Sequence, residues 1–230
     1  MTEETKLLAL DLSLASDAVL EILMDDAPEP EIFGEILSAN RNRPKVMEML
    51  VNSPHVPEEI KVEAQKALNL PADRESMLAL KQHHEVPTQE QQRMSLLMKL
   101  QKLSVGEKVA LALRGGRDVR SILSKDTNKE VAISVVKNPK VTPTEAELIA
   151  HSRNVPEDAL RIISKNREWM KSYGVILALV GNPKTPSGIS STLVSHLKTK
   201  DLVTLEKNKN VPDAVRLNAR RALQGRQQSR

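Results

Sequence analysis

Residues 138–143 read Asn-Pro-Lys-Val-Thr-Pro, and residues 182–186 read Asn-Pro-Lys-Thr-Pro. Related breaks occur at residues 52–57 (Asn-Ser-Pro-His-Val-Pro), 154–156 (Asn-Val-Pro) and 210–212 (Asn-Val-Pro). A helix tends to end before the residue that precedes a proline, and a proline fits the first position of the next helix. Each break therefore predicts the end of one helix, a turn and the start of another. Breaks that recur in this way indicate a repeat architecture.

Capping signals surround these breaks. We expect Asn138 and Asn182 to end helices, because asparagine tolerates the left-handed conformation that terminates many helices. Thr142 and Thr185 are predicted N-caps. Capping boxes are predicted at Ser104–Glu107, Thr127–Glu130 and Thr142–Glu145. The prolines predicted at a first helical position are Pro57, Pro143, Pro156, Pro186 and Pro212.

Apolar residues between the breaks recur at helical spacing. Helices are expected near 105–113, 117–124, 128–137, 143–152, 156–165, 167–181, 187–198, 199–208 and 212–224. Helices this short need neighbours to stack on. Pro143 and Pro186 are 43 positions apart, which suits a repeat of two or three helices. The pattern therefore predicts an α-solenoid.

The same residues carry a family resemblance. The two Asn-Pro-Lys breaks, together with the stretches 153–156 and 166–169 and Tyr173, resemble bacterial HEAT-like and leucine-rich-repeat-variant proteins, including conserved hypothetical members. The resemblance covers about residues 128–225 and implies an all-α right-handed superhelix without an assigned activity. The chain has no cysteine, so it lacks the ligands for the iron–sulfur site of some variant-repeat proteins.

The first part of the chain reads as a separate helical block. Residues 4–26 are expected to form one or two helices, and further helices are expected near 29–40, 46–51 and 57–68. A polar stretch follows, with a weak helix near 74–82, a linker at 83–88 and a helix from 88 to about 103. We therefore divide the chain into an N-terminal acidic helical block (1–70), a connecting segment with a helix (71–103), the repeat solenoid (104–225) and a frayed basic tail (226–230).

Composition narrows the class of protein. The chain is 28% charged and 40% hydrophobic, as expected for a folded protein. The absence of cysteine excludes disulfides and thiolate metal sites. No apolar run is long enough to cross a bilayer, and the acidic start lacks a signal-peptide pattern. These features predict a cytoplasmic protein without a membrane span.

Charge is distributed unevenly. Residues 1–70 carry 14 acidic and 6 basic side chains, whereas residues 71–230 carry 16 acidic and 28 basic ones. The asymmetry fits an anionic partner for the basic part, mutual attraction of the two halves, or well-solvated surfaces. Basic residues cluster near the Gly115-Gly116 pair, a predicted C-cap and turn, and along a later helix. The predicted partner-binding residues are Arg114, Arg117, Arg120, Arg161, Lys165, Arg167 and Lys171.

Other residue types give weaker signals. The five histidines have no metal-ligand spacing and are interpreted as solvated or capping residues, so no metal or cofactor is predicted. No nucleophile, metalloprotease or phosphate-loop motif is present, so no enzymatic activity is predicted. Trp169 and Tyr173 are interpreted as packing residues, although stacking on nucleic-acid bases is the alternative.

The sequence thus predicts a non-catalytic scaffold or adaptor that binds another protein on the surface of the solenoid. The predicted partner has an acidic surface. The alternative is nucleic-acid binding through a basic stripe on the C-terminal repeats. An enzyme built on a HEAT-like scaffold is a third hypothesis, and it would need a pocket that a sequence does not reveal.

Overall fold

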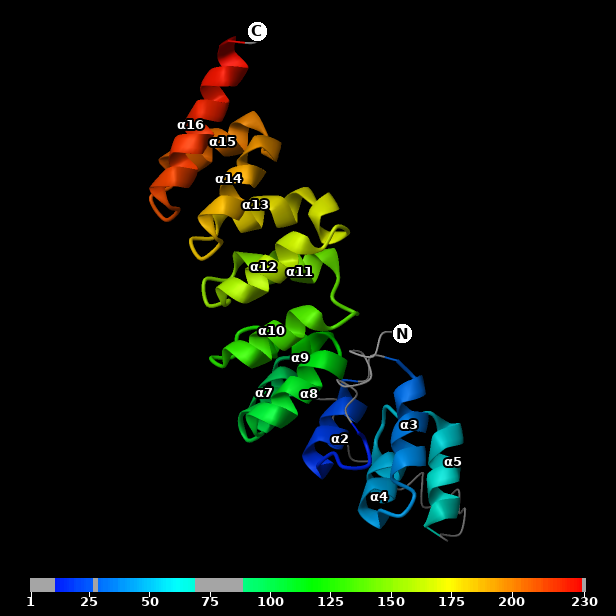
Figure 1. Ribbon diagram of the computed structural model, residues 1–230. Helices are drawn as coiled ribbons and strands as arrows, with labels where there is room; N and C mark the ends of the chain where they lie inside the picture. Colours follow the sequence, from blue (N-terminus) through cyan, green and yellow to red (C-terminus); the bar gives the residue numbers. More distant parts are fainter. Residues whose placement is uncertain (1–10, 27–28, 69–88, 229–230) are drawn as a thin grey trace. The chain divides into compact units, whose positions relative to one another are not determined.

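The computed structural model describes residues 11–26, 29–68 and 89–228. These residues form fourteen α-helices and two short 3-10 helices, and no strand occurs among them (Figure 1). The predicted all-α class is confirmed. Contacts divide the chain into two units, Met1–Ile122 and Leu123–Arg230. The predicted weak helix at 74–82, the linker at 83–88, the start of the first helix and the end of the basic tail lie outside the described residues.

The N-terminal unit contains a small helical core. Its helices are α2 (Asp17–Asp25), α3 (Glu31–Ala39), α4 (Pro44–Asn52), α5 (Glu58–Ala67), α7 (Gln89–Gln101), α8 (Val105–Arg114) and α9 (Arg117–Leu123). Helix α2 packs against α3, α4, α7 and α8, and its side chains Leu20, Ile22 and Leu23 are fully buried. Residues from 104 to 122 therefore group with the N-terminal block by contact, a division that differs from the predicted one.

Within the described residues, part of the predicted helical segment 4–26 is not helical. Residues 11–16 are turn and extended backbone, and α2 begins only at Asp17, where Ser16 caps it by accepting a hydrogen bond from the Val19 amide. Leu14 is 83% exposed. A cluster of leucines indicated a helix, but the capping serine decided where the helix begins.

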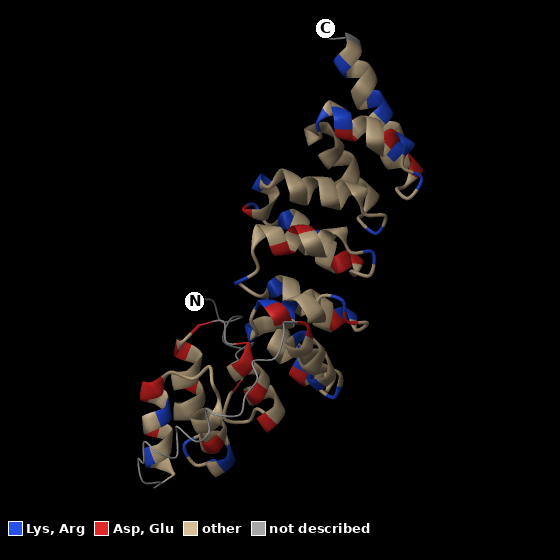
Figure 2. Ribbon diagram, turned by 180° about the vertical axis from the view of Figure 1, so that it is seen from behind, with Lys and Arg blue, Asp and Glu red and all other residues tan. Residues whose placement is uncertain are grey.

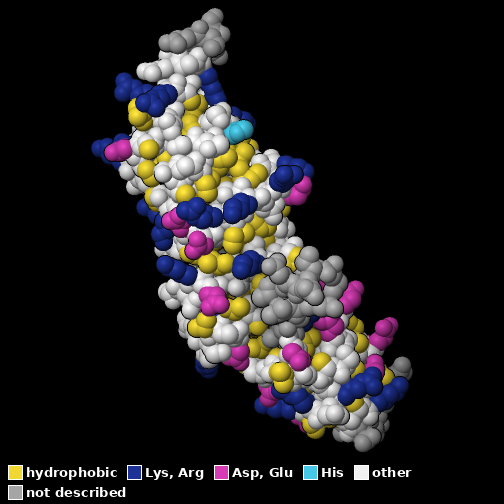
Figure 3. Space-filling view, in the orientation of Figure 1, with side chains coloured by type: hydrophobic (Ala, Val, Ile, Leu, Met, Phe, Trp, Pro, Cys, Tyr) yellow, Lys and Arg dark blue, Asp and Glu magenta, His cyan; other side chains and the backbone are white. Residues whose placement is uncertain are grey.

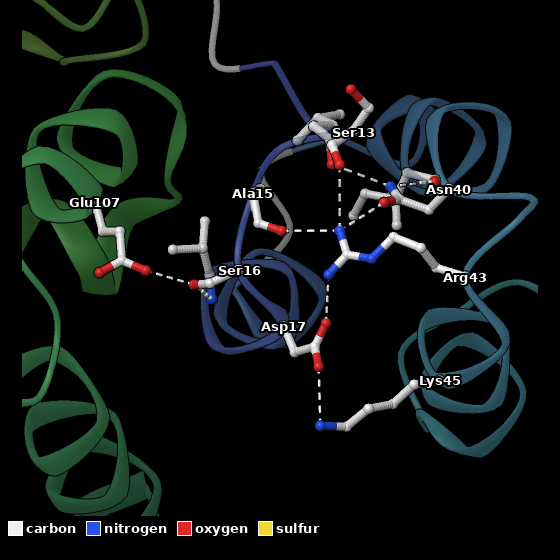
Figure 4. A network of polar contacts seen from close by, with 11 residues as sticks. Ser13, Ala15, Ser16, Asp17, Asn40, Arg43, Lys45 and Glu107 are labelled. Carbon is white, nitrogen blue, oxygen red and sulfur yellow. Dashed lines mark hydrogen bonds and ion pairs between the residues drawn. The ribbon is translucent and has the colours of Figure 1, made fainter.

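Polar contacts hold the segment before α2 in place (Figure 4). The Arg43 guanidinium donates to the carbonyl oxygen of Ala15 at 2.8 Å and to the Asp17 carboxylate at 2.5 Å. The buried Asn40 amide donates to the carbonyl oxygen of Leu12 at 3.2 Å. Arg43 and Asn40 thus attach this segment to the turn between α3 and α4.

Arg43 provides a test of this network. Replacing Arg43 with alanine leaves the Ala15 carbonyl and the Asp17 carboxylate without this donor. We therefore expect the free energy of unfolding to fall by about 2 kcal/mol. Arg41→Ala is the matched control, because Arg41 makes one exposed ion pair, with Glu63, of a kind that contributes about 0–1 kcal/mol. Urea unfolding followed by far-UV circular dichroism measures both, and equal losses would show that the network adds nothing.

The C-terminal unit is a succession of short helices, drawn from green to red in Figure 1. They are α10 (Lys129–Lys137), α11 (Pro143–His151), α12 (Glu157–Lys165), η2 (Trp169–Lys171), α13 (Tyr173–Gly181), α14 (Ser187–Leu193), η3 (Val194–His196), α15 (Thr199–Lys207) and α16 (Asp213–Gln228). Helix α10 packs against α12, and α11 packs against α13. The predicted helices are therefore present, although 167–181 and 187–198 each divide into an α-helix and a 3-10 turn.

The ends of these helices share one construction. Asn138, Ser152, Asn166, Asn182 and Asn208 are C-caps with φ between −63 and −86° and extended ψ. Each cap side chain accepts a hydrogen bond from the backbone N–H two residues later, at 2.9 to 3.4 Å. The predicted left-handed conformation is therefore wrong. The side chain stabilises the turn instead, as asparagine and serine do in Asx and related turns.

The N-terminal caps follow the prediction in part. The capping boxes at Ser104 and Thr142 are confirmed, and Pro143 occupies the first helical position. The box at Thr127 is wrong, because Asn128 accepts the hydrogen bond from Glu130 N–H instead. Pro57, Pro156 and Pro186 are N-cap residues, and Pro212 directly precedes α16. Thr185 is therefore not the N-cap of α14.

Candidate functional site

The seven basic residues predicted to bind a partner fall in both units. Arg114, Arg117 and Arg120 belong to the N-terminal unit, and the other four belong to the C-terminal unit. Arg114 forms an ion pair of 2.9 Å with Glu35, whereas Arg117 is exposed. These residues therefore do not form one continuous basic stripe within either unit.

The prediction that Arg120 lies on a contact surface is wrong. Its side chain is buried, with 6% of the residue exposed, and its guanidinium donates to the carbonyl oxygen of Gly115 at 3.0 Å. Gly115 is the C-cap of α8, and carbonyl groups at a helix end need partners from outside the helix. Arg120 thus joins α8 to α9 instead of facing a partner.

The second cluster lies around α12 and η2. Arg161, Lys165, Arg167 and Lys171 are all exposed, but two of them are neutralised locally. Arg161 pairs with Glu157 at 2.5 Å, and Lys171 pairs with Glu168 at 2.7 Å. Lys165 and Arg167 have no ion pair within the described part of the chain. This surface offers a partner only two unpaired cations.

The two aromatic residues of this unit are occupied. Trp169 is buried, which confirms its interpretation as a packing residue. The Tyr173 hydroxyl contacts the Asp201 carboxylate and accepts a hydrogen bond from Lys198 N–H at 2.9 Å, and the Lys198 ammonium lies 4.7 Å from the ring centroid. Burial, followed by the contact with Asp201, raises the pKa of the Tyr173 hydroxyl. Neither ring is free to stack on a base.

A groove of about 320 Å³ crosses three helices that are distant in sequence. Helix α13 supplies the apolar floor with Leu177 and Ala178, and Leu205 of α15 completes it. Polar and charged side chains lie at its borders, namely His151 at the end of α11, Arg153 in the turn after it and Asp201 in the first turn of α15. The prediction singled out none of these as binding residues, because their proximity depends on how alternate helices pack.

Asn182 fixes the geometry of this groove. It is 3% exposed, and its amide donates to the carbonyl oxygens of Ala150 at 2.6 Å and Ser152 at 3.0 Å. These bonds place the turn after α13 beside the turn after α11. Gly181 also lines the groove, and a Cβ built on it would meet no atom within 4 Å. The space at Gly181 is therefore open.

Each turn beside the groove carries a cation one or two positions after its cap, and Arg153 itself lines the groove. Arg153 follows Ser152, Lys184 follows the Asn182-Pro183 pair, and Lys209 follows Asn208. All three are exposed, and none has an ion pair within residues 123–228. Figure 2 shows Lys and Arg gathered in the turns and at the helix ends of this unit. In Figure 3, exposed hydrophobic side chains of the unit lie between such cations.

A second cavity, of about 890 Å³, lies in the N-terminal unit beside α7. Some of its charged groups are engaged, since Lys99 pairs with Glu21 at 2.9 Å and Asp25 at 2.8 Å. Burial lowers the pKa of Lys99, but the hydrogen bonds to Asp25 and Glu21 outweigh it and raise the value. Asp26 accepts a hydrogen bond from Val119 N–H at 2.9 Å. These contacts join helices and indicate a structural role.

Asp26 predicts a pH dependence of stability. Burial raises the pKa of its carboxyl group in the folded unit, so the folded chain holds this proton to higher pH than the unfolded chain does. The contribution of Asp26 to stability is therefore greatest in acid and is lost as the pH rises from about 4 through the raised value. As the pH rises from about 4 to 7, the Asp26→Asn variant should therefore become more stable relative to the natural chain. Urea unfolding across this range checks it, and a constant difference would contradict it.

Comparisons with other proteins add no relationship, since no family model, curated protein or solved structure matches the chain. Among the described residues, no helix is long and apolar enough to span a membrane. The same residues contain no group of three or more His, Asp or Glu side chains arranged to hold a metal ion. His55, His151 and His196 are exposed, as expected for solvated histidines.

Proposed function

We propose that this protein is a non-catalytic α-solenoid scaffold of the bacterial cytoplasm, whose C-terminal unit binds another protein. In this proposal α10 to α16 are the HEAT-like repeats of a right-handed superhelix, and α2 to α5 are a helical block preceding them. The packing of alternate helices, α10 on α12 and α11 on α13, supports the stacked arrangement. Solenoids use surfaces built from successive repeats to hold their partners.

The observation that carries the proposal is the groove across α11, α13 and α15. Its apolar floor and charged border have the composition of sites that take a side chain of a partner. The border cations Arg153, Lys184 and Lys209 are exposed and unpaired within the C-terminal unit. The described residues hold no group of three or more His, Asp or Glu side chains arranged to bind a metal ion.

Capture with a blocked groove tests this function. The natural chain and a Gly181→Trp variant are immobilised and exposed to a nuclease-treated lysate of the source organism, and bound proteins are quantified by mass spectrometry. Because Gly181 borders open space, tryptophan should fill the groove without disturbing the helix. We expect at least one protein to be enriched on the natural chain and lost from the variant. Equal capture by both would refute a function of this groove.

A second candidate function is nucleic-acid binding. Residues 123–230 carry 19 basic and 10 acidic side chains, a net charge of +9, and such a surface attracts phosphate chains. The buried Trp169 and the occupied Tyr173 ring weigh against single-strand binding. Titration of labelled duplex and single-stranded DNA and RNA at about 50 to 200 mM salt decides it, since affinity that persists at the higher salt would place nucleic acid first.

A further inference from the structure

We propose that the groove across α11, α13 and α15 takes an extended acidic peptide segment of the partner, with an apolar side chain on the floor and carboxylates on Arg153, Lys184 and Lys209. This inference rests on the proposed function, because it names the chemistry of the protein that the groove binds.

Three turns of the C-terminal unit lie beside the groove. Asn182 donates to the carbonyl oxygens of Ala150 and Ser152, which joins the turn after α13 to the turn after α11. Asn182 and Asn208 both line the groove, so the turn after α15 borders the same space. Arg153 lines the groove, and Lys184 and Lys209 directly follow its lining residues Pro183 and Asn208, although the three cations are 31 and 25 residues apart in sequence.

A hydrogen bond within each of these turns holds its backbone in place. In each one, the cap side chain accepts a hydrogen bond from the N–H two residues later, at 3.4 Å for Ser152, 2.9 Å for Asn182 and 3.0 Å for Asn208. The backbone that carries each cation is therefore held before any ligand arrives. A cation on a preorganised backbone loses less conformational entropy on binding than one on a free loop.

Among the described residues, some cations of this unit are neutralised locally, and the cations beside the groove are not. Arg161, Lys171, Arg216 and Arg220 have carboxylates nearby in their own unit. Arg153, Lys184 and Lys209 are exposed without an ion pair in the described part of this unit. Lys165 and Arg167 are unpaired in that part as well, but they lie around α12 and η2, whereas three unpaired cations beside one groove favour a ligand with spaced negative charges.

The lining of the groove suits a peptide better than a phosphate chain. Leu177 and Leu205 offer an apolar floor, and the volume of about 320 Å³ has room for one or two side chains. The Asp201 carboxylate lies in the same groove, where it contacts the Tyr173 hydroxyl, and a peptide, unlike a phosphate chain, can direct a backbone N–H toward it. No free aromatic ring is available among Trp169 and Tyr173 for base stacking. The arrangement therefore favours a peptide.

The test uses labelled twelve-residue peptides that carry one leucine flanked by glutamate and aspartate, with glutamine and asparagine versions as neutral controls. Fluorescence anisotropy with the full chain should show binding of the acidic peptides at least tenfold tighter than of the neutral ones. Replacing the leucine with serine should weaken binding by a similar factor. Gly181→Trp should abolish it.

Charge reversal supplies the matched comparison. The triple variant Arg153→Glu, Lys184→Glu and Lys209→Glu should lose at least tenfold in affinity. The control triple Lys137→Glu, Lys165→Glu and Arg167→Glu changes net charge equally, but these residues lie at the ends of α10 and α12 and in the turn after α12. The control should lose less than threefold. Equal losses in both triples would mean that only overall charge acts, which overturns the inference.

The remaining outcomes are also decisive. Tighter binding of a labelled twenty-nucleotide DNA or RNA than of any peptide would overturn the inference of a peptide ligand. It would support the second candidate function. Dimerisation of the chain alone, lost in Gly181→Trp and seen by light scattering, would identify a second copy as the occupant and overturn the inference. If no peptide binds while Gly181→Trp still loses its captured protein, the inference fails and the proposed function stands. If capture is also unchanged, both fail.

Discussion

Gly116→Ala should destabilise the N-terminal unit by about 3 kcal/mol, an effect of the size that overpacking produces. A Cβ on Gly116 would lie 2.2 Å from the backbone oxygen of Asp26 and 2.5 Å from its carboxylate. The backbone oxygen cannot rotate away, so α9 must separate from the end of α2. That separation also weakens the hydrogen bond from Val119 N–H to Asp26.

Gly34→Ala is the control, and we expect it to increase stability instead of lowering it. Gly34 lies inside α3, and a Cβ there would meet no atom within 4 Å, so alanine should stabilise the helix by about 0.5–1 kcal/mol. Urea unfolding by far-UV circular dichroism measures both variants. Trp169, the single tryptophan, is buried in the other unit, so its fluorescence shows whether a variant also disturbs the C-terminal unit. A Gly116→Ala chain as stable as the natural one would contradict the close approach of α2 and α9.

Asn182→Ala should destabilise the C-terminal unit by about 3 kcal/mol, since it removes three hydrogen bonds of about 1 kcal/mol each. The side chain donates to the carbonyl oxygens of Ala150 and Ser152 and accepts from Lys184 N–H. The site is buried, so water does not readily replace these partners. The unfolding transition of Trp169 fluorescence measures the loss.

Asn208→Ala is the matched control for Asn182. Asn208 caps α15 and accepts from Asn210 N–H at 3.0 Å, but it is only half-buried. Its loss should cost about 1 kcal/mol. If the two substitutions cost the same, the bonds from Asn182 to the neighbouring turn contribute nothing, and the alignment of the turns along the groove loses its support.

The helices were predictable because their ends are local. Proline positions, capping boxes and apolar spacing act within a few residues, and α11, α12 and α15 begin and end within one residue of the prediction. The Gly115-Gly116 turn was also predicted, but for a different reason. Gly115 has φ of −63° and Gly116 is not left-handed either, so Gly116 is needed for the close approach of Asp26 and not for a left-handed backbone. Such a requirement comes from another helix and leaves no local pattern.

The candidate site was much less predictable. Charge clustering along the sequence favoured Arg120 and Arg161, yet Arg120 is buried and Arg161 is paired with Glu157. The groove residues Arg153 and Asp201 are 48 positions apart, and only the packing of alternate helices brings them together. One signal was available, since a cation recurs one or two positions after the caps Ser152, Asn182 and Asn208.

Because each turn is closed by bonds within itself, the chain is suited to growth by duplication. Asn138, Ser152 and Asn166 follow one another at intervals of 14 residues. A duplicated stretch of 28 residues, from 139 to 166, would carry its own caps and would add one helix to each of the two alternating sets. A duplication of 14 residues would exchange the sets beyond the insertion and place polar faces against apolar ones. Insertions and deletions in this unit should therefore be tolerated when they add or remove two helices.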